Sequence, residues 1–443
     1  MSSGEEITKN KQEDCCYYSL EDKPPLPETG VLGFQHMLAM FVGIITPPLI
    51  IAGVAGLGPG ETGFFVSMAL IMSGIVSFVQ CKRFGPVGAG LLGVTGTSFT
   101  FVPMAIAAAE AGGIPLVLGM SLATAPVQII ISRFIKQAQQ LFPPIVTGTV
   151  VTLIGLSLIE VGMQDFAGGA GAADFGSPRN LMVGFFVLVV IILCNRFGSG
   201  LVKIGAVAIG LIAGYILAIP LGMVDFAPIM DAGWFTIPRP LHFGLDFDLA
   251  HLLPWVIAYF ITSIESLGDL TAIAETSNEP ITGNLHKERL SRGLLADGLG
   301  SAVAAIFNSM PNTTFSQNIG VIQITKVGSR VVGYAVAAIL LLLGFLPKIG
   351  AIVSVMPEPV LGGATLALFG MVAVAGINIA TKDGLTDRKI FIFSISLSFG
   401  LGITFHPEAV EQLPELLATM LSSGVAVGAI LALILNLLIP REN

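Results

Sequence analysis

Apolar stretches of roughly 20 residues recur along the whole chain, separated by short polar or glycine- and proline-rich connections. An α-helix needs about this length to cross the hydrocarbon core of a bilayer. The pattern predicts an all-α polytopic membrane protein with fourteen segments. We expect the first seven near residues 31–51, 62–80, 88–103, 113–131, 142–162, 181–195 and 204–223. The second seven are expected near 249–272, 290–308, 312–325, 331–347, 359–379, 390–404 and 416–437.

Composition and charge agree with this prediction. Only 11% of the 443 residues are charged, whereas soluble domains carry about 25%. The net charge of -8 gives no indication of nucleic-acid binding. With fourteen segments, 18 of the 21 lysines and arginines lie on the same side of the membrane as the N-terminus. Only Arg179, Arg239 and Lys348 lie on the other side. By the positive-inside rule, both termini are therefore expected in the cytoplasm, for a multi-pass protein of the inner (plasma) membrane.

The segments divide into two groups of seven. A polar N-terminal tail, 1–29, precedes a first half, 30–223, and an extracytoplasmic loop, 224–247, precedes a second half, 248–443. An odd number of segments per half predicts opposite topology, that is, an inverted repeat. Two short similarities support it: FPPIVTG at 142–148 recurs as MPEPVLG at 356–362, and TSF at 97–99 recurs as TTF at 313–315.

The four cysteines show neither metal-ligand spacing nor a disulfide framework. Cys15 and Cys16 form an adjacent pair in the tail. We expect them to be free thiols, with palmitoylation or metal binding as the alternative.

The stretch 309–330 lies between two long apolar segments, yet it is rich in polar residues. Unsatisfied polar groups cost several kcal/mol each in hydrocarbon, so this stretch is expected to face protein or a watery cavity. Pro311 and Gly320 predict that it is broken. A broken polar element at the midplane is typical of the substrate site of a secondary transporter. Its polar residues are Asn312, Thr313, Thr314, Ser316, Gln317, Asn318 and Gln323.

Three carboxylates lie inside predicted segments: Glu265 and Asp269 in the eighth and Asp297 in the ninth. Ionisable groups at this depth are functional candidates by default. Glu265 and Asp269 share a helix face, and one of two such neighbours is expected to hold a proton near neutrality, as proton coupling requires. The alternative is that Asp269 or Asp297 caps a broken helix. His36, which begins the first segment, is either a packing histidine or a proton-linked group.

The third predicted segment, GLLGVTGTSFTFVP, combines glycines with β-branched and aromatic residues. Its backbone is expected to form a short extended stretch that offers N–H and C=O groups to a substrate. Ser98 and Phe99 are its candidate binding residues, Phe99 as a flat surface for a planar ring. The alternative is close helix packing through small residues.

Four short motifs follow in chain order: QH at 35–36, ESLGD at 265–269, LADG at 295–298 and QNIG with a later TK at 317–326. Together they resemble the nucleobase–ascorbate transporter family, also called nucleobase:cation symporter 2, over essentially the whole chain. The resemblance implies a core domain of segments 1–4 and 8–11 and a gate domain of segments 5–7 and 12–14. It also implies short antiparallel strands in segments 3 and 10, an elevator-type movement and a homodimer.

By the same resemblance, Glu265 and Gln317 bind the base beside Phe99, and Asn318 shapes the site. Asp269 and Asp297 serve coupling or architecture. Gln317 together with ESLGD resembles the purine branch, the bacterial xanthine and uric acid permeases. Ile319 and Ser98 depart from residues common in xanthine-selective members, which leaves uric acid, hypoxanthine and guanine open as substrates.

Our interpretation is a proton-coupled purine importer, with H⁺ as the coupling ion and no other cofactor. A sodium-coupled or uracil-type carrier of the same fold is the alternative, because carboxylates and broken backbones also coordinate Na⁺. Enzymatic function is not expected, since the chain lacks HExxH and GxSxG motifs and a phosphate-cradling loop.

Overall fold

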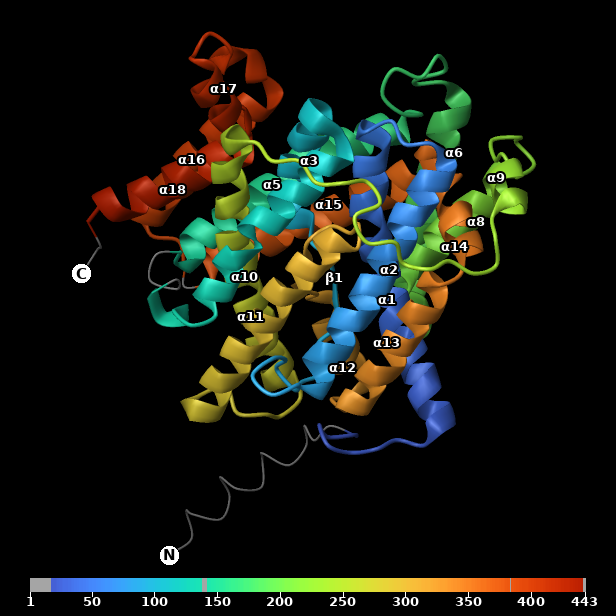
Figure 1. Cartoon of the computed structure of the whole chain (residues 1–443), viewed down its shortest axis with the longest axis horizontal. Helices are drawn as coiled ribbons and strands as arrows, with labels where there is room; N and C mark the ends of the chain where they lie inside the picture. Colours follow the sequence, from blue (N-terminus) through green and yellow to red (C-terminus); the bar gives the residue numbers. More distant parts are fainter. Residues whose placement is uncertain (1–16, 138–141, 383, 441–443) are drawn as a thin grey trace, which may run out of the picture.

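The computed structural model describes residues 17–137, 142–382 and 384–440 (Figure 1). Cys15 and Cys16 lie outside the described residues. The elements of the first half include one strand and one 3₁₀ turn among helices. They are α1 (Leu26–Val54), α2 (Pro59–Lys82), β1 (Thr95–Thr97), η2 (Phe99–Phe101), α3 (Val102–Ile131), α5 (Pro144–Phe166), α6 (Pro178–Phe197), α7 (Leu201–Ile204) and α8 (Ala206–Ala218).

The connection to the second half contains the short helix α9 (Ala227–Asp231). In Figure 1, α16 to α18 gather at one edge, and β1 lies within the bundle. The elements of the second half are η3 (Leu249–His251), α10 (Leu252–Thr276), α11 (Gly283–Ile306), β2 (Asn312–Thr314), α12 (Gln317–Thr325), α13 (Arg330–Gly344), α14 (Pro347–Ser354), α15 (Glu358–Thr381), α16 (Asp387–Phe405), η4 (Pro407–Val410), α17 (Glu415–Ser422) and α18 (Gly424–Leu438).

Within the described residues, eight helical stretches are long and apolar enough to cross a membrane, and the bent pair α13–α14 passes the same test jointly. The chain is therefore a multi-pass helical membrane protein. Two further apolar helices, α8 and α18, are shorter than a full span.

Several predicted segment ends were wrong. The third predicted segment does not end near residue 103. Its helical part begins with the 3₁₀ turn η2 at Phe99, continues as α3 from Val102 and breaks at Gly113, where φ is 68°. Only glycine adopts this conformation readily. The ninth segment begins at Gly283 rather than near 290, since its first turns are polar and continue the helix beyond the apolar stretch.

The eleventh predicted segment, 331–347, corresponds to α13 alone. The separate helix α14 begins at Pro347, is bent by 75° from α13 and was not predicted. Proline is common at the first position of a helix, because it has no N–H that would be left without a partner there. The fourteenth is divided into α17 and α18 at Ser423. The Ser423 hydroxyl accepts a hydrogen bond from the N–H of Ala426 at 3.3 Å and so caps α18.

The strands β1 and β2 pair antiparallel in the middle of the fold. Gly96 lies opposite Thr313, with Thr95 opposite Thr314 and Thr97 opposite Asn312. All six residues are buried. This two-stranded ribbon joins the halves of the chain at membrane depth, where each backbone group requires a partner within the protein.

The helices α5 and α15 pack antiparallel along a seam of small residues. A Cβ added at Gly148, Gly155 or Gly376 would approach the backbone N of Ala380, Ala373 or Thr152, respectively, to 2.3 Å. Glycine at these positions lets the two helix backbones come close, as is common between membrane helices. The repeated motifs FPPIVTG and MPEPVLG begin these two helices.

We predict that Gly155→Ala destabilises the protein by about 1–3 kcal/mol, because the methyl group has to separate α5 from α15. Gly370→Ala on α15 is the matched control, since nothing lies within 4 Å of its added Cβ. The control should be neutral or up to about 1 kcal/mol more stable. Thermal unfolding in detergent measures both, and equal midpoints would contradict the seam.

Candidate functional site

Each strand of the ribbon leads directly into a helix. β1 ends at Thr97 and η2 starts at Phe99, whereas β2 ends at Thr314 and α12 starts at Gln317. Because the strands are antiparallel, the two helix N-termini lie at opposite ends of the ribbon. Their unpaired N–H groups and helix dipoles give this region a positive electrostatic character that favours anionic or carbonyl-bearing ligands.

Two buried serines hold the strands from outside. The Ser77 hydroxyl of α2 accepts from the N–H of Thr95 at 2.9 Å and lies 3.3 Å from its carbonyl oxygen. The Ser301 hydroxyl of α11 accepts from the N–H of Asn312 at 3.0 Å and lies 3.2 Å from its carbonyl oxygen. Matching serines from the two halves thus bind the outer edge of each strand at its first residue.

Asp297 is fully buried on α11 and accepts hydrogen bonds from three elements. Oδ2 accepts from the hydroxyls of Ser266 at 2.8 Å and Thr314 at 3.1 Å. Oδ1 accepts from Nε2 of Gln80 at 3.0 Å. The Gln80 amide is oriented by the N–H of Ala89, which donates to Oε1 at 2.9 Å. Asp297 therefore joins α2, α10, α11 and β2, and its arrangement is that of a structural carboxylate.

Glu265 and Asp269 lie on one face of α10, together with the exposed Gly268. Both carboxylate side chains are only partly buried, in contrast to Asp297. The hydroxyl of Thr100 donates to Oε2 of Glu265 at 3.1 Å. Oδ2 of Asp269 has no hydrogen-bond partner among the described residues. Oδ2 of Asp269 is itself buried, so the partly exposed carboxylate of Glu265 is the acceptor that this face presents.

His36 is buried in α1 and contacts α12. Its Nδ1 lies 2.7 Å from Oδ1 of Asn318, whose Nδ2 donates to the carbonyl oxygen of Leu92. This chain of contacts connects α1, the stretch before β1 and the first turn of α12. His36 and Asn318 position the start of α12 and do not face an open space.

Gln317 is the first residue of α12 and is partly buried. Its side-chain amide makes no hydrogen bond within the part of the chain that is described. Ile322 of the same helix shares an apolar cluster with Leu267 and Leu270 of α10. The amide of Gln317 therefore lies on a helix that packs against the helix of Glu265, with its donors and acceptor available.

Phe99 is partly buried, and its ring centroid lies 6.0 Å from that of Phe369 on α15 at an interplanar angle of 82°. Ser98 is buried, and its hydroxyl lies 3.5 Å from that of Thr262 on α10. Ser98 thus braces η2 against α10, whereas Phe99 presents an aromatic ring between the ribbon and α15.

The sequence-predicted residues fall into two groups. Glu265, Asp269, Gln317 and Phe99 keep accessible surface near the ribbon, whereas Asp297, His36, Asn318 and Ser98 are buried in internal contacts. Sequence reasoning missed the polar residues of α2 that hold the ribbon and Asp297. The available signal was the pair Ser77 and Gln80 within an apolar helix, because residues three apart lie on one face.

We predict that Asp297→Asn destabilises the protein by about 1–3 kcal/mol, because its amide N–H₂ must face a donor from Gln80, Ser266 or Thr314. Asp269→Asn is the matched control, since Oδ2 of Asp269 has no partner to lose. Thermal unfolding of both variants in detergent tests this. A smaller loss for Asp297→Asn than for Asp269→Asn would contradict a structural role for Asp297.

Comparison with known proteins agrees with the fold. The model of the Permease family matches residues 27–409. The xanthine permease XanP of Escherichia coli is 43% identical over 439 residues, covering 96% of this chain and 95% of XanP. The xanthine permease XanQ of the same organism is 39% identical over 435 residues, covering 96% of this chain and 93% of XanQ.

Among solved structures, the transmembrane domain of the cyanobacterial bicarbonate transporter BicA superposes with a TM-score of 0.59 at 14% identity. The match covers 95% of this chain and 99% of that domain. At this identity the likeness concerns the fold alone. The sequence matches go further, and the chain belongs to the nucleobase–ascorbate transporter family, whose members are permeases and not enzymes.

Proposed function

We propose that this protein imports purine nucleobases by proton symport, with xanthine and uric acid as the first candidate substrates and hypoxanthine and guanine as further ones. The observation that carries the proposal is the partly open face of Glu265 and Asp269 beside the ribbon, with Gln317 on a neighbouring helix. The two relatives named xanthine permeases support the same substrate class.

The site chemistry suits a flat heterocycle. A xanthine or urate ring carries N–H and C=O groups side by side along its edges. An ionised Glu265 only accepts hydrogen bonds, whereas Gln317 both donates and accepts, so together they read such an edge. Phe99 supplies an apolar face for the ring. Ser98 and Asn318 act indirectly, by bracing η2 and the start of α12.

Proton coupling is assigned to the pair Glu265 and Asp269. Each is close enough to the other for charge repulsion, and Asp297 adds to the negative potential at Asp269. Adding one proton to this face relieves the repulsion and readies Glu265 or Asp269 to release it when the site faces the other side. His36 is the remaining candidate in the relay, although its contact with Asn318 favours a positioning role.

The proposed architecture is fourteen segments in a 7+7 inverted repeat. The core domain comprises segments 1–4 and 8–11, the gate domain segments 5–7 and 12–14, and the core slides as an elevator along the gate. Contacts across this boundary are apolar: Phe99 meets Phe369, and Phe142 stacks on Phe260 with ring centroids 5.2 Å apart. Apolar contacts are non-directional, so they permit sliding. A homodimer in the inner membrane, with cytoplasmic termini, completes the proposal.

A sodium-coupled or uracil-type carrier is the alternative. Gln317 favours the purine assignment, because uracil-type members of the family resemble this chain but carry glutamate at that position. A proton gradient and a sodium gradient, applied separately to the same proteoliposomes, distinguish the two coupling ions.

We predict that Glu265→Gln abolishes uptake of radiolabelled xanthine driven by an acid-outside pH gradient in proteoliposomes. The amide cannot carry the proton, and it presents N–H groups where the base requires an acceptor. Glu61→Gln, an exposed residue in the first turn of α2, is the control and should transport normally. Undiminished pH-driven uptake by Glu265→Gln would refute the coupling assignment.

We further predict that Gln317→Ala raises the apparent KM for the purine roughly tenfold. The variant loses the hydrogen bonds between the amide and the base, and about 1.4 kcal/mol of binding free energy corresponds to a tenfold change in affinity. Gln323→Ala is the control on the same helix, because Gln323 is exposed. Competition by unlabelled purines, uracil and ascorbate against radiolabelled xanthine measures the specificity of both. If Gln317→Ala leaves the order of competitors and the KM unchanged, Gln317 does not contact the base.

A further inference from the structure

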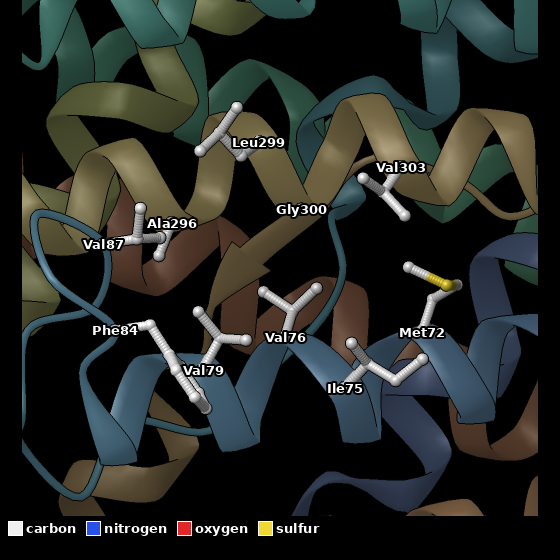
Figure 2. Close-up of a pocket in the computed structure, with 10 residues that line it drawn as sticks. All are labelled: Met72, Ile75, Val76, Val79, Phe84, Val87, Ala296, Leu299, Gly300 and Val303. Carbon is white, nitrogen blue, oxygen red and sulfur yellow. The ribbon is translucent and has the colours of Figure 1, made fainter.

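An apolar groove of about 270 Å³ lies between α2 and α11 (Figure 2). α2 contributes residues at helical spacing, Met72, Ile75, Val76 and Val79, and α11 contributes the matching positions from Ala296 to Val303. Phe84, in the connection after α2, closes one end. Every lining side chain is apolar, so the groove suits hydrocarbon rather than water.

The shape of the groove follows from Gly300. A Cβ at this position would lie 2.7 Å from Cγ2 of Val76, so the absence of a side chain lets α2 approach α11 there. On either side of this contact, Ile75 and Leu299 remain 41% and 38% exposed. The groove therefore opens on the outer surface of the helix bundle and has a closed floor.

Basic residues gather at the Phe84 end. Arg292 precedes Ala296 by four residues in α11, so it extends the groove-lining face of that helix by one turn. Arg83 directly follows the last residue of α2 and directly precedes Phe84. Nζ of Lys82 lies 5.5 Å from the centroid of the Phe84 ring. The cationic groups and the groove are thus immediate neighbours.

The charge at this end is only partly compensated. Glu288 pairs with Arg292 and lies 3.9 Å from Nη2 of Arg83. Nη1 of Arg292 is buried and has no hydrogen-bond partner among the described residues. Three cationic side chains, from Lys82, Arg83 and Arg292, therefore lie at this end with one carboxylate, so the end carries a net positive charge.

We propose that this groove and its basic end bind one anionic phospholipid. One acyl chain lies between α2 and α11, and the phosphate lies at Lys82, Arg83 and Arg292. The planar donors of arginine match phosphate oxygens, and basic pockets between membrane helices select anionic headgroups. A zwitterionic lipid has the same chain, but its ammonium group is repelled at this end.

The site lies directly behind the residues that hold the ribbon. Ser77 follows Val76 of the groove floor, and Ser301 follows Gly300. Their hydroxyls hold Thr95 and Asn312, the first residues of the two strands. A lipid chain in the groove thus supports the spacing of α2 and α11 from the outside while these serines set the ribbon on the inside.

Native mass spectrometry of the full chain in detergent, titrated with phosphatidylglycerol or phosphatidylcholine, tests the headgroup part. We expect the double variant K82Q/R83Q to bind phosphatidylglycerol about 30-fold more weakly, given about 1 kcal/mol per basic residue near an anionic lipid. Its preference over phosphatidylcholine should be lost. R196Q/K203Q removes two exposed charges elsewhere and should bind as the wild type does. Equal binding of the two lipids by the wild type would overturn the proposal.

Filling the groove tests the acyl-chain part. Ile75→Trp should lose binding of phosphatidylglycerol, whereas Ile192→Trp, at a 53% exposed position of α6, should retain it. Retention of phosphatidylglycerol by Ile75→Trp at wild-type affinity would overturn the assignment of the groove. If Ile75→Trp instead changes the oligomeric mass and leaves lipid binding intact, a second copy of the chain covers this face and the lipid assignment is wrong.

Discussion

The structure depends on one constraint: the backbone of a short two-stranded ribbon lies at membrane depth, where water cannot satisfy it. The strands satisfy each other along one edge only. Ser77 and Ser301 bind the opposite edges at Thr95 and Asn312, one from each half of the chain. Asp297 then ties the ribbon to α10 through Ser266 and to α2 through Gln80. Buried polar groups that are paired in this way favour one arrangement of the surrounding segments.

This rigidity determines where a ligand can be recognised. Ser266, which contacts both Asp297 and Thr313, is the neighbour of Glu265 in α10. Glu265 is therefore presented from a helix that is fastened to the ribbon, and Gln317 follows β2 by only three residues. Side chains held on such a helix are preorganised, whereas a loosely held group loses affinity through ordering entropy when it binds a ligand.

The apolar contacts are distributed differently. The seam of α5 and α15 is close-packed through glycine. Phe99 and Phe369, in contrast, meet only through an apolar contact of their rings. The ribbon and the seam are thus fixed by close contacts, whereas the contact between Phe99 and Phe369 is apolar. The groove between α2 and α11 adds an outer support at the back of the ribbon.

The length and composition of the apolar stretches were sufficient to predict a multi-pass helical protein, because hydrocarbon imposes the same requirement on every segment. Local chemistry also marked Glu265, Gln317 and the broken stretch around Pro311, since polar residues inside apolar segments need a special reason. The segment ends at Gly283 and Ser423 were missed, because polar turns continue a helix past the membrane and a single serine cap divides one.

Only the tertiary structure decided which polar residues are accessible and which are structural. Asp269 and Asp297 are equivalent as acids inside apolar segments of the sequence. Asp297, however, has three side-chain donors, whereas Oδ2 of Asp269 is buried without a partner and the residue as a whole is only partly buried. The difference arises from Gln80 and Thr314, which lie 217 residues before Asp297 and 17 residues after it. Hydrogen bonds between distant segments depend on how helices pack, and no local pattern encodes them.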